Sequence, residues 1–385
     1  MREYFKELKD PRQAGKIKHN LLEIIVMTIC ATIAGCDVWE DIADYCRVKE
    51  AWFRDALHMH LENGVPSHDT MQRVWGMLEP KEFERCFCAW VDAVCQKTEG
   101  EIISIDGKTI RRSGGRDQKP IHMVSAWANQ LQMVLGQLAT DEKSNEITAV
   151  PELLEMLDIK GCIITADAMS CQKTITEKIA EKEADYVLAL KDNHPVFHDE
   201  VRTYFEAALK EPRNYPAVKS LKTTDSGHGR VETRTYYLTN EIDWYEDKTN
   251  WTNLRAFGMV CSRVEKQGVV TEDVRHFITS LDEIARFSMA VRKHWGIENS
   301  LHWCLDMTFR EDYSRIRKDH SAENMAVVRH MALNILKNHP AKSVLHENAA
   351  VAPMRTISLP KSWIAFMRKL DTDADSFVLD RRRRA

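Results

Sequence analysis

The sequence predicts an α/β protein with a mixed β-sheet, preceded by an all-helical N-terminal domain. Before about residue 100, apolar residues recur every three or four positions, as in Leu21 to Ile29, which is the spacing of a helix with one buried face. After residue 100, short β-branched runs alternate with helical patterns, which is typical of a sheet covered by helices. The chain has 385 residues and is 44% hydrophobic, which is enough for two or three domains with a sizeable core.

The helical N-terminal domain is expected to cover residues 1–98. Helices are expected at about 38–47 and 49–58, and Ser67 is a good N-cap for a further short helix that ends near Trp75. This last helix fits the recognition helix of a helix-turn-helix-like unit. A packed helical cap with no role in DNA binding explains the same pattern equally well.

The sheet is expected to lie in a domain of residues 99–340. Its elements, in chain order, are three strands at 101–106, 121–129 and 131–139, a helix at 148–157 with Pro151 in its first turn, a strand at 161–166, a helix at 172–183 and a strand at 186–190. Three successive strands before the first crossover helix match a ribonuclease H-like mixed sheet. Strand-like runs at 233–238, 254–264 and 274–280 predict a β-rich insertion at about 220–281, and residues 341–385 remain as a C-terminal tail.

Composition limits the class of protein and its partners. The formal net charge is −4, so any binding to DNA must use local basic patches. The ten cysteines form no C-x-x-C pair and lie mostly in apolar segments, which favours reduced, buried thiols. No signal peptide pattern is visible, and the longest apolar run, 21–35, is too short for a bilayer of ~30 Å. We therefore expect a soluble, cytoplasmic protein with no membrane partner.

Three acidic residues lie in settings that suit one metal-dependent site. Asp106 and Asp167 each end an apolar, strand-like run, and Glu298 lies in the helix-like stretch 291–303. In-line displacement at a phosphodiester is catalysed by two divalent cations roughly 3.5 to 4 Å apart, and carboxylate oxygens suit Mg²⁺ or Mn²⁺. We expect Asp106 to contact both cations, with Asp167 and Glu298 each holding one. The three are too far apart in the chain for a local motif, so only the fold can bring them together.

Other interpretations of these residues stay open. An aspartate after an apolar strand is often a turn or cap residue, so the prediction depends on the combination. His294 and His302 flank Glu298 at helical spacing, where they would orient a phosphate or a metal-bound water. A zinc site made of these three residues is an alternative that leaves the aspartates without a role. Glu311 and Asp312 are the other candidates for the third metal ligand.

Basic and polar residues near these motifs are the expected DNA contacts. Three cationic side chains directly follow the first aspartate, where they would neutralise phosphates or simply belong to a solvated loop. Two residues follow the last strand, where the acids should converge. A Gly-rich turn in the insertion adds a histidine and two arginines, with Arg230, Glu232 and Arg234 on one face of a strand. We favour contact with the DNA backbone here, and a surface hairpin is the alternative. The full set is Lys108, Arg111, Arg112, Lys191, Asn193, His228, Arg230, Arg234, His294, His302 and Arg315.

Five separated motifs are shared, in order, with a known family. They are S-I-D-G-K-T-I-R from Ser104, T-A-D-A from Thr165, L-K-D-N from Leu190, G-H-G-R-V-E-T-R from Gly227 and H-W-G-I-E-N-S-L-H-W from His294. With them the chain resembles the DDE transposases of bacterial insertion sequences, in the branch of H-repeat-associated proteins linked to Rhs elements. The resemblance runs from about residue 10 to residue 337. It implies a ribonuclease H-like catalytic domain, a helical transposase-associated domain, and Mg²⁺-dependent DNA cleavage and strand transfer.

The resemblance also implies partners. These are Mg²⁺, for which Mn²⁺ would substitute, double-stranded DNA at element ends and target sites, and a homodimer or larger assembly on nucleoid DNA.

One departure from the family pattern concerns the third acid, because Val291, His294 and Leu305 stand where related transposases often have Tyr, Arg and Lys. Two other functions remain: a nuclease without strand transfer, and an inactive DNA-binding relic. No G-x-x-x-x-G-K-[ST] loop occurs, which disfavours a helicase or kinase-like enzyme.

Overall fold

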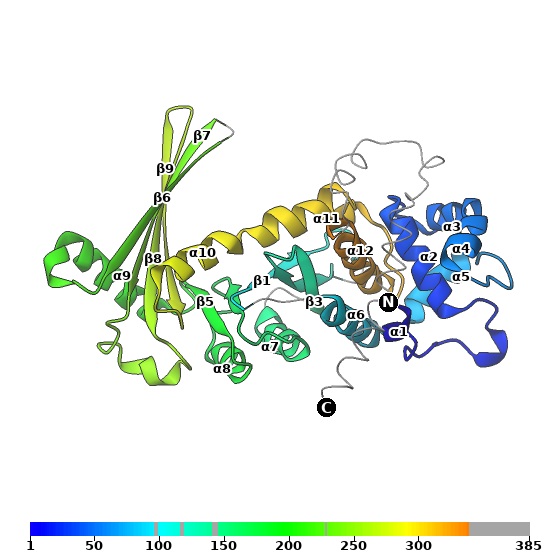
Figure 1. Ribbon diagram of the computed structural model, residues 1–385, viewed down its shortest axis with the longest axis horizontal. Helices are drawn as coiled ribbons and strands as arrows, with labels where there is room; N and C mark the ends of the chain where they lie inside the picture. Colours follow the sequence, from blue (N-terminus) through cyan, green and yellow to red (C-terminus); the bar gives the residue numbers. More distant parts are fainter. Residues whose placement is uncertain (96–98, 116–118, 141–144, 228, 339–385) are drawn as a thin grey trace.

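A computed structural model describes residues 1–95, 99–115, 119–140, 145–227 and 229–338 (Figure 1). Nine strands form one sheet; they are β1 (Ile102–Thr109), β2 (His122–Ala128), β3 (Met133–Thr140), β4 (Ile163–Ala166), β5 (Asp185–Leu190), β6 (Lys219–Gly227), β7 (Arg230–Thr239), β8 (Ala256–Lys266) and β9 (Val269–Thr279). The helices before the sheet are α1 (Arg2–Phe5), α2 (Leu21–Ile33), α3 (Trp39–Val48), α4 (Glu50–Leu57), α5 (His68–Met77) and α6 (Pro80–Val94). The later helices are α7 (Glu146–Met156), α8 (Lys173–Glu181), α9 (Pro195–Lys210), α10 (Ile284–His294), α11 (Trp303–Met307) and α12 (Ser321–Lys337).

The sheet is mixed, and its strand order is β3-β2-β1-β4-β5-β9-β8-β7-β6. Strands β1, β4 and β5 run parallel to one another. The pairs β1–β2, β2–β3, β5–β9, β9–β8, β8–β7 and β7–β6 are antiparallel. The expectation of an α/β protein with a mixed sheet is therefore confirmed. The strands expected between residues 101 and 190 are all present, with ends that shift by up to three residues.

The β-rich segment spans residues 219–279, and it continues the main sheet. Strands β7, β8 and β9 overlap the three runs that the sequence shows, but β6 and helix α9 have no counterpart among the predicted elements. Strand β9 pairs with β5 through Val187 and Thr279, so no separate sheet forms. The outer halves of β6–β9 project from the body as an arm (residues 222–227, 229–234 and 261–275; Figure 1), most of whose side chains are exposed.

The predicted position of Pro151 is wrong. Helix α7 begins at Glu146, so Pro151 lies inside the helix rather than in its first turn. The earlier start is anchored by the carboxylate of Glu146, which bonds to His122 on β2. A tertiary contact therefore outweighs the local preference of proline for the first turn, at the loss of one backbone hydrogen bond inside the helix.

The two faces of the sheet are covered by different helices, as alternation along each strand requires. Ile102, Ile163 and Val187 pack with Phe287 of α10 in one apolar cluster. Their strand neighbours, such as Ile103 and Ile164, point the other way into the larger cluster, which includes α7 and α8. Figure 1 shows α10 on one side of the strands and α7 and α8 on the other.

The N-terminal helices share the larger cluster with the sheet, and α12 connects the two. Between residues 1 and 95 the structure contains helices and no strand. Asn324 of α12 donates to the carbonyl oxygens of Trp75 and Leu78, both at 2.9 Å. Ser67 caps α5 as expected, by accepting from the backbone N–H of Thr70. The boundary at residue 98 and the helix-turn-helix interpretation remain predictions.

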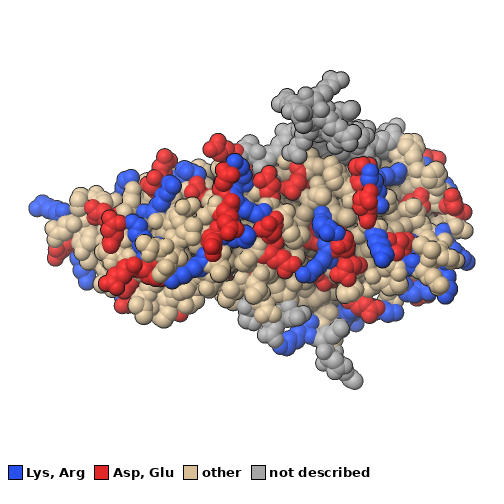
Figure 2. All heavy atoms as spheres, turned by 90° about the horizontal axis from the view of Figure 1, so that it is seen from below, with Lys and Arg blue, Asp and Glu red and all other residues tan. Residues whose placement is uncertain are grey.

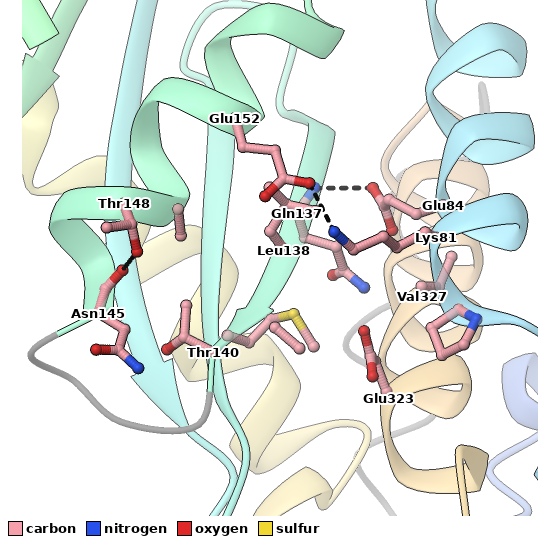
Figure 3. A pocket seen from close by; sticks show the side chains of 14 residues that line it. Lys81, Glu84, Gln137, Leu138, Thr140, Asn145, Thr148, Glu152, Glu323 and Val327 are labelled. Atoms are coloured by element: carbon pink, nitrogen blue, oxygen red, sulfur yellow. Dashed lines mark hydrogen bonds and ion pairs between the residues drawn. The ribbon is translucent and has the colours of Figure 1, made fainter.

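The β3 edge of the sheet is covered by side chains instead of a further strand. The amide of Asn334 on α12 accepts from the backbone N–H of Val134 and donates to its carbonyl oxygen, both at 2.8 Å. Glu84 on α6 accepts from the backbone N–H of Gln137 at 2.8 Å, beside a small pocket that Lys81 also lines (Figure 3). These contacts use backbone N–H and C=O groups of the edge strand, and they block its pairing with another chain.

Glu84 makes stability depend on pH. Burial raises the pKa of its carboxyl from 4.5 to about 8, so the folded state binds more protons than the unfolded state between these values. Stability therefore falls as pH rises through this window. Glu84→Gln keeps the acceptor and does not ionise. We expect the variant to be more stable than wild type at pH 9 by on the order of 3 kcal/mol, or about 3 to 4 °C in Tm, and similar at pH 5.

Thermal unfolding at pH 5, 7 and 9 measures this effect. The control is Glu82→Gln, because Glu82 lies on the same helix but has a side chain that is 45% exposed and pairs with Arg85. A Glu84→Gln effect that is the same at all three pH values would contradict the assignment.

None of the helices in the described residues is both long and apolar enough to span a membrane. No disulfide joins any of the ten cysteines, and seven of them are buried.

Candidate active site

The parallel pairing of β1 and β4 brings two of the predicted acids to the same edge of the sheet. Ile105 and Ala166 form the last parallel pair, so Asp106, inside β1, comes next to Asp167, which directly follows β4. Asp106 has the strand parity of Ile102, and Asp167 has that of Ile163. Both acids therefore lie on the face that α10 covers.

Glu298 reaches this face from the helical segment that follows α10. It lies in η5 (Ile297–His302), a π-helical turn between α10 and α11. Such wide turns are uncommon and occur frequently at functional sites. Gly296, just before the turn, lies so close to β2 that a Cβ would be 2.1 Å from Oδ1 of Asn129. Only glycine allows this approach, which brings the helix onto the sheet.

The three acids line one cavity of about 1160 Å³. Asp106 and Asp167 are partly buried, whereas Glu298 is exposed. Asp167 is oriented by its own backbone, because Oδ1 accepts from the N–H groups of Met169 and Ser170 at 3.0 and 3.3 Å. The residues that the sequence identifies as one site thus come together around one hollow.

The pKa of Asp106 reflects how close the acids lie to one another. Burial, together with the negative charges of Asp167, Glu298 and Glu146, raises the pKa of Asp106 from 3.8 to about 7. A hydrogen bond from the backbone N–H of Gly107 acts in the opposite direction. The cavity therefore concentrates negative charge that no neighbouring cation fully offsets.

Two histidines join the helical segment to the strands. Nδ1 of His294 lies 3.0 Å from Oγ1 of Thr165, and Nδ1 of His302 lies 3.7 Å from Oδ2 of Asp106. Burial lowers both pKa values to about 4. The rings are therefore neutral at pH 7 and would contact a phosphate only as hydrogen-bonding groups. Nε2 of His302 is buried without a hydrogen-bond partner among the residues the structure describes.

A buried pair beside Asp106 could not be recognised from the sequence. His122 and Glu146 bond to each other against β1, where a Cβ on Gly107 would be 2.3 Å from both. The glycine after the aspartate is thus required by close packing. No local pattern predicts it, because the two partners come from different elements.

The carboxylates of Asp106, Asp167 and Glu298 suit a divalent cation chemically, although they do not form a compact metal site in this structure. Among the described residues, no three His, Cys, Asp or Glu side chains are grouped closely enough to hold a metal ion. Three carboxylates around one cavity are the hard ligands that Mg²⁺ and Mn²⁺ prefer. The charges that raise the pKa of Asp106 are charges that a cation would neutralise. The residues therefore fit such an ion chemically. A zinc site of His294, Glu298 and His302 receives no support from this arrangement.

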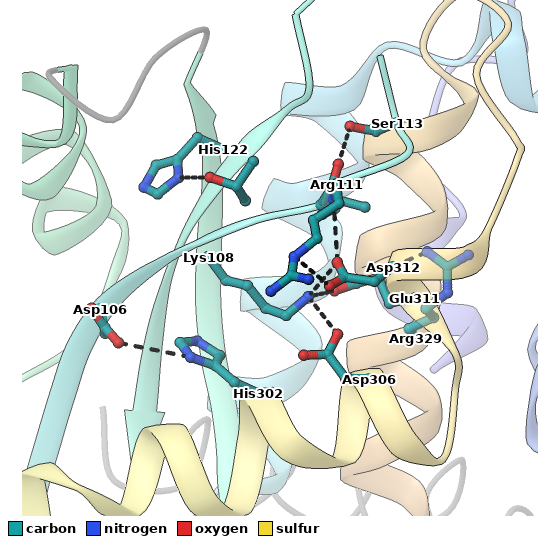
Figure 4. A network of polar contacts seen from close by, with 12 residues as sticks. Asp106, Lys108, Arg111, Ser113, His122, His302, Asp306, Glu311, Asp312 and Arg329 are labelled. Atoms are coloured by element: carbon teal, nitrogen blue, oxygen red, sulfur yellow. Dashed lines mark hydrogen bonds and ion pairs between the residues drawn. The ribbon is translucent and has the colours of Figure 1, made fainter. Parts of the chain in front are cut away.

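Lys108 and Arg111, which follow Asp106 in the chain, form ion pairs with carboxylates of the protein itself. The ammonium of Lys108 lies 2.8, 3.1 and 3.2 Å from carboxylate oxygens of Asp306, Glu311 and Asp312 (Figure 4). Arg111 pairs with Asp312 at 3.2 Å, although its side chain is 82% exposed. These contacts also occupy Glu311 and Asp312, the other candidates for the third ligand. Asp306, which sequence reasoning missed, lies at helical spacing after His302.

The remaining predicted DNA contacts are spread over several surfaces. Arg112 lies 5.2 Å from the ring of Tyr313, Lys191 is exposed at the cavity, Asn193 donates to the carbonyl oxygen of Ala168, and Arg315 is exposed. In the arm, Arg230 and Arg234 both face Glu232, as their strand spacing predicts. His228 lies outside the described residues. Figure 2 shows acidic and basic side chains interspersed over the face in view, in line with the small net charge.

Comparisons with known proteins identify the family. Residues 97–335 match the family described as "Transposase DDE domain", and residues 2–91 match "DDE_Tnp_1-associated". A putative transposase of Escherichia coli O157:H7, YncI, is 42% identical over 87% of each chain. The H repeat-associated putative transposase YhhI of E. coli K12 is 39% identical over 87% of this chain and 90% of its own.

Among solved structures, a piggyBac transposase in a synaptic complex with hairpin DNA aligns with a TM-score of 0.40 and 11% identity. The alignment covers 100% of this chain and 77% of the other, and a likeness at this level supports no further argument. The two family matches and the two relatives from E. coli confirm the resemblance seen in the sequence motifs. The chain belongs to the DDE transposases of bacterial insertion sequences, together with the H-repeat-associated proteins.

Proposed function

We propose that this protein cleaves DNA at the ends of its element and joins the exposed 3′-hydroxyl to target DNA, with Asp106, Asp167 and Glu298 as the catalytic acids. The observation that carries the proposal is that these three residues, far apart in the chain, line one cavity. Direct attack by water and then by the 3′-hydroxyl needs no covalent intermediate with the protein.

The catalytic domain is proposed to be ribonuclease H-like and to span residues 99–340. The order β3-β2-β1-β4-β5, with three antiparallel strands followed by parallel β4 and β5, supports this assignment. Strands β6–β9 would then be the insertion, and residues 1–98 a transposase-associated domain that contributes to DNA binding. The proposed tail, 341–385, lies outside the described residues.

Magnesium is the proposed cofactor, with Mn²⁺ as a substitute, and the three acids would hold it. Bound there, such ions supply activation of the attacking oxygen and stabilisation of the leaving oxygen. Asp167 is already oriented for this role by two backbone N–H groups. His302 is proposed to orient a phosphate or a water through its unpartnered Nε2, as a neutral hydrogen-bonding group.

Double-stranded DNA is the proposed partner, from element ends and target sites within the nucleoid. Lys191 at the cavity, with Arg230 and Arg234 in the arm, would contact phosphates of the DNA. Arg111, Arg112 and Arg315 are exposed on the side toward η6 (Glu311–Tyr313) and would extend this contact. Two ends must be joined in one event, which favours a homodimer or a larger assembly on DNA.

The reaction can be tested with the purified protein and DNA that carries the sequences flanking its gene. With Mg²⁺ or Mn²⁺, we expect nicks at defined positions and slower-migrating joined products on a denaturing gel, and neither product in EDTA. Nicks without joined products would indicate a nuclease of the same fold. Specific binding with no cleavage would indicate an inactive relic, for which the lack of a preformed metal-ligand group among the described residues is the observation in favour.

A further inference from the structure

Lys108 is enclosed by carboxylates instead of facing DNA. It lies on β1 two residues after Asp106, so both side chains leave the same face of the strand. Its side chain is 11% exposed, and its ammonium contacts Asp306, Glu311 and Asp312 (Figure 4). The ammonium of Lys108 therefore has three carboxylate partners within 3.2 Å and little access to solvent.

All three carboxylates belong to the segment that follows Glu298. Asp306 lies on α11, which continues the π-helical turn, and Glu311 and Asp312 lie in η6. Glu311 is 2% exposed and also faces Arg329 of α12, which is 3% exposed, at 3.6 Å. One ammonium therefore ties the strand that carries Asp106 to the helical segment that carries Glu298, and through Glu311 to α12.

The π-helical turn is held on both sides. Before it, His294 contacts Thr165, and the guanidinium of Arg275 lies 4.8 Å from the ring centre of Trp295. At its last residue, His302 contacts Asp106, and beyond it Asp306, Glu311 and Asp312 all contact Lys108 of β1. The contact of His302 spans 3.7 Å, whereas Lys108 lies within 3.2 Å of three carboxylates. The anchor on this side is therefore mainly the ion-pair cluster.

We infer that Lys108 is a positioning residue that fixes the place of Glu298 relative to Asp106. This inference rests on the proposed function only in taking these two acids as parts of one site. The charges in the cluster balance, since Lys108, Arg111 and Arg329 face Asp306, Glu311 and Asp312. A cation neutralised in this way attracts a phosphate weakly, so the cluster holds the site together instead of binding substrate.

The test compares Lys108→Met with Lys108→Arg, which keeps the charge. The control is Lys81→Met, because Lys81 is 71% exposed, pairs with Glu152 and lies away from the acidic cavity. The first readout is hydrogen exchange in residues 297–313 of the protein alone, without DNA or metal. We expect Lys108→Met to speed exchange there by about tenfold or more, and Lys108→Arg and Lys81→Met to resemble wild type.

The second readout separates positioning from DNA contact. For Lys108→Met we expect kcat for cleavage to fall by about 100-fold while KM for DNA is unchanged. The slope of log affinity for DNA against log salt should also stay unchanged, whereas loss of a phosphate contact would reduce it by about 0.9. Lys108→Arg should recover most of the lost rate.

The inference is overturned if exchange in residues 297–313 is unchanged in Lys108→Met, or if the salt slope falls and kcat does not. It is also overturned if Lys81→Met has the same effects, because the change would then be a general loss of stability. If the proposed function is wrong, the result is different: Lys108→Met would still speed hydrogen exchange in residues 297–313, but the wild-type protein itself would cleave no DNA.

Discussion

Asp106→Asn and Asp167→Asn each lower the rate of strand cleavage by at least about 10³-fold, which corresponds to ~4 kcal/mol of transition-state stabilisation. The reason is that both carboxylates line the cavity from adjacent strands and supply the negative charge that a divalent cation needs. An amide of the same shape removes that charge. DNA affinity should be unchanged or slightly higher, because each substitution removes repulsion from phosphates.

Single-turnover cleavage on labelled DNA, with binding measured separately, checks both parts of this prediction. The matched control is Asp243→Asn, because Asp243 is 94% exposed and pairs with Lys248 outside the cavity. Cleavage at the wild-type rate by either cavity variant would remove that aspartate from the site. Equal losses of binding and cleavage would indicate a structural role.

Unfolding of Asp106→Asn distinguishes lost chemistry from lost structure. The pKa of Asp106 is raised from 3.8 to about 7, so above pH 7 the folded protein must carry a buried charge. That charge destabilises the folded state relative to the unfolded one. In metal-free buffer at pH 8, the variant should therefore melt at a higher temperature than wild type while it cleaves no DNA.

Divalent cations should stabilise the protein in the absence of DNA. Binding to the folded state alone contributes about 2.7 kcal/mol at a concentration 100 times the Kd, which is roughly 3 °C in Tm for a chain of this length. We expect Mn²⁺ and Mg²⁺ to raise the Tm of wild type in this way. The double variant Asp106→Asn/Asp167→Asn should show no rise, because it keeps the cavity but loses two of the three carboxylates that are proposed to hold the cation.

Thermal unfolding across a series of Mn²⁺ concentrations measures this effect, with the Asp243→Asn variant as control. A rise of the same size in wild type and in the double variant would place the cation elsewhere. Wild type that does not respond at all would show that the three acids do not bind the ion without DNA.

The strands that carry the aspartates were predictable because their signals are local. Asp106 and Asp167 each follow a β-branched run, and parallel pairing then sets both at one edge. Strand β6 was missed because its sequence, K-S-L-K-T-T-D-S-G, lacks apolar alternation. It is the edge strand of the exposed arm, and its pairing with β7 stabilises it where burial does not.

Other features of the site depend on contacts across the whole chain. Lys108 is followed by two arginines, which suggests a basic loop, but two of its carboxylate partners lie 203 and 204 residues away. The π-helical turn at Glu298 has no sequence signature of its own, so its helical pattern alone could not single out that glutamate. The sequence motifs could, and the cavity supports their choice.

A cleavage assay of Glu298→Gln beside Glu311→Gln decides whether Glu298 is the third catalytic acid. Glu298 is exposed in the cavity, whereas Glu311 is buried between Lys108 and Arg329. We expect Glu298→Gln to bind the element ends like wild type and to cleave at least about 10³-fold more slowly with Mg²⁺. Glu311→Gln should retain measurable cleavage. Wild-type cleavage by Glu298→Gln, with complete loss in Glu311→Gln, would make Glu311 the third acid instead of Glu298.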